Sequence, residues 1–124
     1  MDEELLRELF AAVGPIQIRK LFGGQGIYAD GLIIAVVVHG ELMLKVDAQS
    51  ESTFEEAGSR PWTYARPGKS AVRMPYFTTP DEAFDDPDVA ARWAELAVEA
   101  ARRSKSAKKT APTPRAKKPN PKTK

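Results

Sequence analysis

The sequence predicts an α+β domain in which helices at both ends of the folded region pack on one antiparallel sheet of about five strands. Three observations lead to this class. Apolar residues recur at helical spacing near each end, short β-rich runs lie between them, and two-residue turns containing Gly join several of these runs. A two-layer arrangement follows, because the helices and the sheet each have an apolar face to bury.

The first helix is predicted by an apolar stripe behind an acidic first turn, which suits the helix dipole. The stripe consists of Leu5, Leu6, Leu9, Phe10 and Val13. Gly14-Pro15 then ends the pattern.

Four strands are predicted next, at Gln17 to Phe22, Gly26 to Ala29, Leu32 to Val38 and Glu41 to Val46. The short connections Asp30-Gly31 and His39-Gly40 favour tight antiparallel hairpins, because Gly accepts the positive φ that such turns require. We therefore expect a meander rather than parallel strands joined by helices.

A short helix capped by Asp47 is predicted to run through Ala57, with Phe54 facing the sheet and Gly58 ending it. A second hairpin is predicted from Trp62 to Ala65 and from Ser70 to Phe77.

The hydroxyl of Thr79 and the proline after it predict one capped helical turn. Asp86-Pro87-Asp88 predicts the start of the last helix, which reaches about Arg103. Its apolar stripe is Val89, Trp93, Leu96 and Ala100. Packing of this helix on the sheet predicts that Trp93→Ala is strongly destabilising.

The net charge of +2 conceals two unlike segments. Residues 1–101 hold nine basic and 17 acidic residues, a net charge of −8, whereas residues 102–124 hold ten basic residues and no acid. We expect a folded domain at 1–103 and a disordered, basic tail rich in Lys and Pro at 104–124, because the tail has no aromatic or branched aliphatic residue to bury.

Several classes of protein are disfavoured by composition. The absence of cysteine excludes disulfides, a thiol nucleophile and zinc sites containing Cys. The longest apolar run has seven residues, Leu32 to Val38, far short of a membrane span. The acidic start Met1-Asp-Glu-Glu is unlike a secretory signal, so we expect a cytoplasmic protein.

Motifs with a possible chemical role are weak. Gly24 to Ala29 fits a loose dinucleotide pattern, but a strand rather than a helix follows, which favours a glycine-rich bulge. His39, the single histidine, falls at a predicted turn. Asp85, Asp86 and Asp88 lack the spacing of a calcium loop, and helix capping explains Asp86 and Asp88 without a metal. We therefore expect no catalytic residue, no metal site and no cofactor.

Two basic sets are candidates for binding. The first would lie on the sheet, where cations and aromatic rings could hold an anionic or planar ligand or a protein partner: Arg19, Lys20, Lys45, Tyr64, Arg73 and Tyr76. Alternation favours Met74 in the core and Arg73 outside, and cations covering a sheet face remain the simpler explanation.

The second set is the tail, whose cations would attract nucleic acid without reading its sequence. They are Arg102, Arg103, Lys105, Lys108, Lys109, Arg115, Lys117, Lys118, Lys122 and Lys124. A solubilising tail, one folded back on the acidic domain, and one lying on an anionic membrane surface remain alternatives.

The order of motifs resembles the N-terminal domain of the TfoX (Sxy) proteins, which regulate competence for DNA uptake in bacteria. The matching segments are Arg19 to Tyr28, Leu42 to Asp47, Phe54, Trp62 to Tyr64, Met74 to Tyr76, and Asp85 to Trp93. The resemblance implies a small α+β domain, similar to secretion-chaperone-like folds, with no known catalytic activity.

The sequence thus favours a non-enzymatic regulatory or adaptor domain, linked to competence or transcription regulation, whose tail adds non-specific affinity for nucleic acid. One alternative is a small domain or enzyme that binds an anionic ligand on the sheet. Another is a purely structural module that forms a homodimer.

Overall fold

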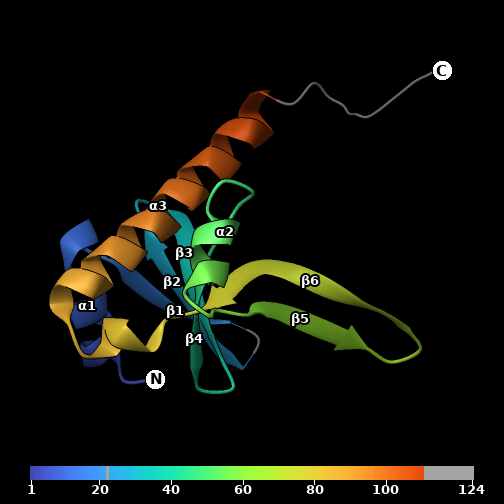
Figure 1. Ribbon diagram of the computed structural model, residues 1–124, viewed down its shortest axis with the longest axis horizontal. Helices are drawn as coiled ribbons and strands as arrows, with labels where there is room; N and C mark the ends of the chain where they lie inside the picture. Colours follow the sequence, from blue (N-terminus) through green and yellow to red (C-terminus); the bar gives the residue numbers. More distant parts are fainter. Residues whose placement is uncertain (22, 111–124) are drawn as a thin grey trace.

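A six-stranded antiparallel sheet forms one layer of the molecule (Figure 1), one strand more than the expected number of about five. The computed structural model describes residues 1–21 and 23–110. The sheet order is β1-β2-β3-β4-β6-β5. The strands are β1 Gln17–Leu21, β2 Gly24–Ala29, β3 Leu32–Val38, β4 Glu41–Lys45, β5 Pro61–Arg66 and β6 Lys69–Thr78.

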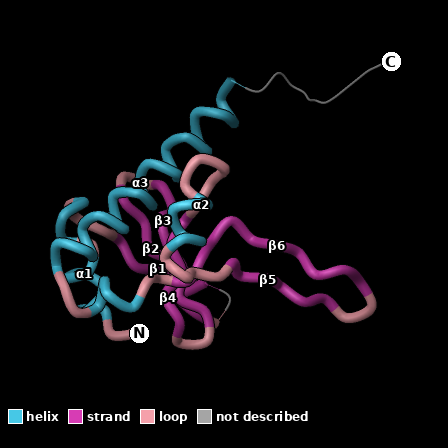
Figure 2. Tube along the Cα trace, viewed as in Figure 1, coloured by secondary structure: helices cyan, strands magenta, loops and turns pink. Residues whose placement is uncertain are grey.

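The helices form the second layer, with α3 lying across the sheet (Figure 2). They are α1 Glu3–Leu9, the 3-10 turn η1 Ala11–Val13, α2 Glu51–Glu56, the 3-10 turn η2 Asp81–Phe84, and α3 Pro87–Thr110. Aromatic rings join these elements: the ring of Phe54 on α2 lies 4.7 Å from that of Trp93 on α3 and 6.0 Å from that of Phe77 on β6. The predicted α+β class is therefore confirmed.

The two predicted hairpin turns are present between β2 and β3 and between β3 and β4. Asp30 and His39 have φ of 52° and 53°, and the glycines that follow them have φ of 78° and 76°. Positive φ at both central residues is the backbone of the turn that best matches the twist of paired strands. The first four strands consequently form the expected meander.

The meander does not extend to the last two strands, because β6 rather than β5 pairs with β4. β6 is antiparallel to both neighbours, so β5 runs in the same direction as β4 and could pair with it only in parallel. Phe77 near the end of β6 also belongs in the core, whereas Pro61 at the start of β5 suits an edge strand.

The starts of two helical elements differ from the prediction, and the start of a third agrees with it. Asp47 caps a turn, accepting from the backbone N–H of Ser50 at 3.1 Å, and α2 itself begins at Glu51. The hydroxyl of Thr79 does not cap η2; it donates to the carbonyl of Leu42 at 2.9 Å. Asp86 accepts from the N–H of Asp88 at 2.9 Å, as the predicted start of α3 requires.

The last helix extends further than the sequence predicted. α3 continues to Thr110 rather than ending near Arg103, so residues 104–110 of the segment expected to be disordered are helical. No Gly or Pro occurs between Pro87 and Pro112, and lysines near the C-terminus of a helix interact favourably with the helix dipole. The rest of the expected tail, 111–124, lies outside the described residues.

Candidate functional site

Among the described residues, no helix packs on one face of the sheet, and we call this face the open face. Its apolar cluster consists of the buried residues Val36, Met43 and Tyr76 with the partly buried Leu21, Ile33, Val38, Trp62 and Met74. All eight residues belong to strands, whereas the larger core cluster joins the other face to the helices. The sheet thus presents a second, smaller apolar surface away from the helical layer.

Cross-strand register assigns two basic residues to the open face, because paired residues point to the same side of a sheet. Arg19 pairs with Gly26, which pairs with Val36 of the open-face cluster. Lys45 pairs directly with Tyr76.

Each of these cations lies over an aromatic ring. The guanidinium carbon of Arg19 is 5.4 Å from the ring centroid of Tyr28, and the ammonium nitrogen of Lys45 is 5.2 Å from that of Tyr76. Such cation–π contacts hold long side chains against the surface. Trp62 extends the aromatic surface, with its ring 6.3 Å from that of Tyr76.

Burial also affects the chemistry of Tyr76. Only 6% of this residue is exposed, and loss of solvation raises the pKa of its phenol to about 12, with a smaller contribution from Tyr28. The phenol of Tyr76 is therefore harder to ionise than that of an exposed tyrosine.

Two members of the predicted basic set lie on the opposite face. Lys20 pairs with Gln25, and Gln25 pairs with Val37 of the larger core cluster, so Lys20 lies on the helix-covered face. Arg73 lies 5.4 Å from the ring of Phe77 and forms an ion pair with Glu51 of α2 at 3.4 Å. The structure therefore brings together Arg19, Lys45 and Tyr76 but separates Lys20 and Arg73 from them.

The outer part of the β5–β6 hairpin, residues 62–74, projects beyond the sheet, and we call it the arm (Figure 1). β4 pairs with β6 only from Tyr76 to Thr78, so the arm is a two-stranded ribbon. Tyr64 pairs with Val72, which is two residues from Met74 and on the same face. Tyr64 is 52% exposed, more than any other large apolar residue among the described residues.

The predicted tail residues within the structure lie on α3. Arg103 does not point freely into solvent: its Nε and Nη2 donate to the carboxylate of Asp47 at 2.5 and 3.0 Å. These hydrogen bonds hold the pKa of Asp47 below its ordinary value, partly opposed by burial. Sequence reasoning missed this contact, because nothing local relates residues 56 positions apart.

The other predicted tail cations are less constrained or are not described. Arg102 is exposed and lies 3.9 Å from the carboxylate of Asp30, a weak surface contact. Lys105 is exposed, and the backbone at Lys108 and Lys109 belongs to α3. Arg115, Lys117, Lys118, Lys122 and Lys124 lie outside the described residues.

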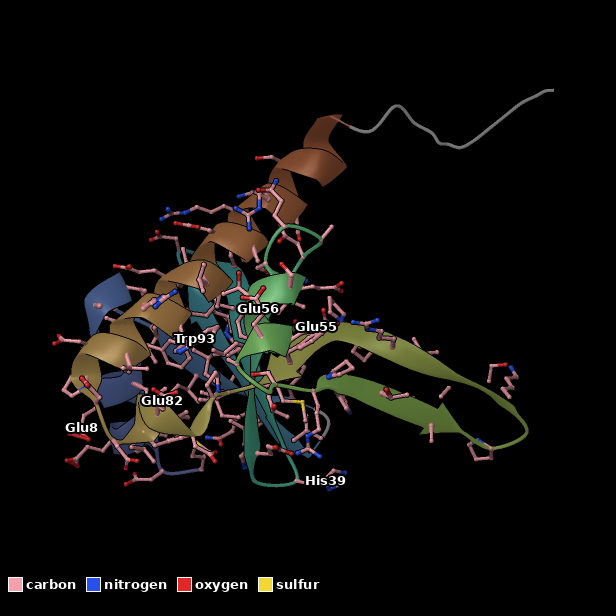
Figure 3. All side chains as sticks on the ribbon, viewed as in Figure 1. Glu8, His39, Glu55, Glu56, Glu82 and Trp93 are labelled. Atoms are coloured by element: carbon pink, nitrogen blue, oxygen red, sulfur yellow. The ribbon has the colours of Figure 1, made fainter. Side chains whose placement is uncertain are left out.

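The weaker motifs take the structural roles that the sequence favoured. Gly24 to Ala29 is strand β2, with a bulge between Ile27 and Tyr28, and no helix follows it. His39 lies at the tip of the β3–β4 turn, apart from the labelled glutamates (Figure 3). Within residues 1–21 and 23–110, no group of three or more metal-ligating side chains is placed to hold an ion.

Charge is divided between the two layers. The six strands contain six basic residues and one acid, Glu41, whose carboxylate lies 3.9 Å from Arg60. The helices before residue 102 contain eleven acids and two basic residues, Arg7 and Arg92. Figure 3 shows Glu8, Glu55, Glu56 and Glu82 on the helical elements. The sheet layer is therefore basic and the helical layer acidic.

These features define a two-layer α+β domain with a helix-covered face and an open face bearing cations and aromatic rings. Among the described helices, none is both long and apolar enough to cross a membrane. Residues 8–101 match the family model of the TfoX N-terminal domain, and the chain belongs to this family. No curated protein matches the chain significantly.

Proposed function

We propose that this protein is a cytoplasmic regulatory or adaptor domain without catalytic activity, linked to competence or transcription regulation, whose basic C-terminal segment attracts nucleic acid. Membership of the TfoX N-terminal domain family supports the regulatory role. The separation of charge carries the nucleic-acid part of the proposal: ten cations and no acid follow Ala101, beyond a segment of net charge −8.

The structure supports this arrangement at the root of the basic segment. α3 extends to Thr110, and Arg102 and Lys105 are exposed on it. Arg103 is held by Asp47, so this cation stabilises the fold rather than extending toward a ligand. The remaining cations can neutralise phosphates without base contacts, which predicts binding that weakens steeply with salt.

The experiment compares the mobility of a DNA duplex with the full chain and with a full-length variant in which Lys117, Lys118, Lys122 and Lys124 are changed to Gln. We call this variant the neutral-tail protein. Each cation on a phosphate contributes about 0.9 to the slope of log affinity against log salt, so four should lower its magnitude by roughly 3 to 4. A slope unchanged by the four substitutions would contradict the proposal.

A charge control uses Arg92→Gln in the full chain. Arg92 is exposed in the folded domain, and its substitution lowers the net charge without touching the basic segment. This variant should keep the wild-type salt slope. If it lost as much per charge as the neutral-tail protein, net charge rather than the segment would explain the binding.

A further inference from the structure

We propose that the open face and the arm form a second nucleic-acid site, which binds single strands through stacking on aromatic side chains. This site lies in the folded domain and is separate from the basic segment after Ala101. It combines three observations: an apolar sheet face without helices, cations resting on aromatic rings, and an exposed tyrosine on a projecting ribbon.

The aromatic residues supply the surface for bases. Tyr64 is half exposed on the arm, and Trp62 is partly exposed at its base, on the same apolar cluster as Tyr76. Arg19 rests on Tyr28 and presents a planar guanidinium, which also stacks on bases. Stacking requires bases that are not already paired and stacked within a duplex, so this surface fits a single strand better than a double helix.

Two cations on the open face suit a phosphate backbone. Arg19 and Lys45 both lie on this face, each over an aromatic ring. Glu41, the one acid in the described strands, lies 3.9 Å from Arg60. A phosphate chain crossing this surface therefore meets a guanidinium and an ammonium group beside the aromatic rings.

The size of the surface is also adequate. Four strand spacings separate β1 from the end of β6 that pairs with β4, which gives a width of about 19 Å before the arm is added. Single-strand sites of four or more nucleotides are common on sheet surfaces of comparable build.

A second copy of the chain fits this face less well. A two-fold symmetric contact places the same patch of both copies together. Arg19 and Lys45 of one copy would then share an interface with the same cations of the other. Glu41 is the one strand acid available to offset them, and it already lies beside Arg60.

The test uses fluorescence anisotropy with a labelled 15-mer of thymidylate, in the neutral-tail protein so that four of the ten cations of the basic segment are absent. Tyr64→Ala should weaken binding roughly 5- to 100-fold, the range found when one stacking aromatic is removed. Phe84→Ala is the matched control, because Phe84 is a similarly exposed aromatic residue at 39% but lies in η2 of the acidic layer. It should leave the affinity unchanged.

A second pair of variants tests the charges. Lys45→Gln should weaken binding of the 15-mer and reduce its salt slope by about 0.7, the value for one phosphate contact on a single strand. Arg92→Gln on α3, the control, should do neither. Circular dichroism confirms that each variant is folded.

The outcomes separate this site from the basic segment. A smaller salt slope for duplex binding in the neutral-tail protein, with single-strand binding that still depends on Tyr64, supports both proposals. If Tyr64→Ala leaves the affinity within twofold, or weakens duplex and single-strand binding equally, the stacking site is wrong whatever the segment does. A Tyr64→Ala variant that changes the oligomeric state but not the affinity would assign the face to a second copy.

Discussion

Removal of the Trp93 side chain tests the packing of the two layers. Trp93 is 8% exposed on α3, and its ring lies 4.7 Å from that of Phe54, which in turn lies 6.0 Å from Phe77 on the sheet. Trp93 also borders the junction of α3 with Leu9 of α1 and Leu42 of β4. The side chain therefore links α3 with α1, α2 and the sheet.

Trp93→Ala removes this link and leaves a cavity. The helices and strands around the cavity hold one another in place and cannot all move inward to fill it. Replacing a buried aromatic residue with Ala lowers the free energy of unfolding by about 3 to 5 kcal/mol. Loss of the contact between the rings of Trp93 and Phe54 accounts for about 0.5 to 1.5 kcal/mol of this. Total stability of a domain is about 5 to 15 kcal/mol, so the loss is a large share. For about 110 residues, roughly 4 °C per kcal/mol gives a fall in Tm of about 12 to 20 °C.

Thermal unfolding followed by far-ultraviolet circular dichroism measures this effect, since tryptophan fluorescence itself changes in the variant. Phe84→Ala removes an aromatic side chain that is 39% exposed and should cost less than about 1 kcal/mol. If Trp93→Ala lowered Tm by no more than Phe84→Ala, the packing of α3 on α2 and the sheet would be refuted.

Three further predictions concern single contacts. A double-mutant cycle with Asp47→Asn and Arg103→Gln should show a coupling free energy of about 1 to 3 kcal/mol at pH 7. Because Arg103 lowers the pKa of Asp47, this stabilisation is present above the ordinary pKa of 3.8. It is lost as the pH falls below 3.8 and through the lowered pKa of the folded state. Gly24→Ala should cost more than about 2 kcal/mol by chemical denaturation, because a Cβ there would lie 1.9 Å from the carbonyl oxygen of Val37 and β2 must separate from β3. Burial raises the pKa of Tyr76 from 10.0 to about 12, so the free energy of unfolding should fall by about 2 to 3 kcal/mol as the pH rises from 10 to 12. Tyr76→Phe should remove this pH dependence. An equal fall in the free energy of unfolding of that variant would contradict the assignment to Tyr76.

Local signals predicted most of the elements, because the determining interactions lie within a few residues. Asp30-Gly31 and His39-Gly40 form the expected turns, since positive φ selects those residue types. Asp86 caps α3 through a contact two residues away. In each case the residues that determine the turn or the cap lie within two or three positions of one another.

Long-range choices were not predictable in the same way. The exchange of β5 and β6 depends on strand direction after α2, which no local motif specifies. The pairing of Arg103 with Asp47 depends on where α3 passes the end of β4. Alternation along β6 places Arg73 and Tyr76 on opposite faces of the sheet. The sequence does not say which of these faces the helices cover, and the position of Phe77 in the core shows that it is the face of Arg73.

Because charge is divided between the layers, the two proposed nucleic-acid sites would affect different steps of binding. Fields from the acidic helices and the basic sheet oppose each other, and at physiological salt either is screened beyond about 8 Å. A ligand would therefore gain from the open face only after contact, through stacking and short-range ion pairing, which chiefly sets the rate of dissociation. The basic segment after Ala101 has no acid of its own, so it would act on approach and raise the rate of association. Neutralising the segment should accordingly slow association with a single strand, and Tyr64→Ala should speed dissociation.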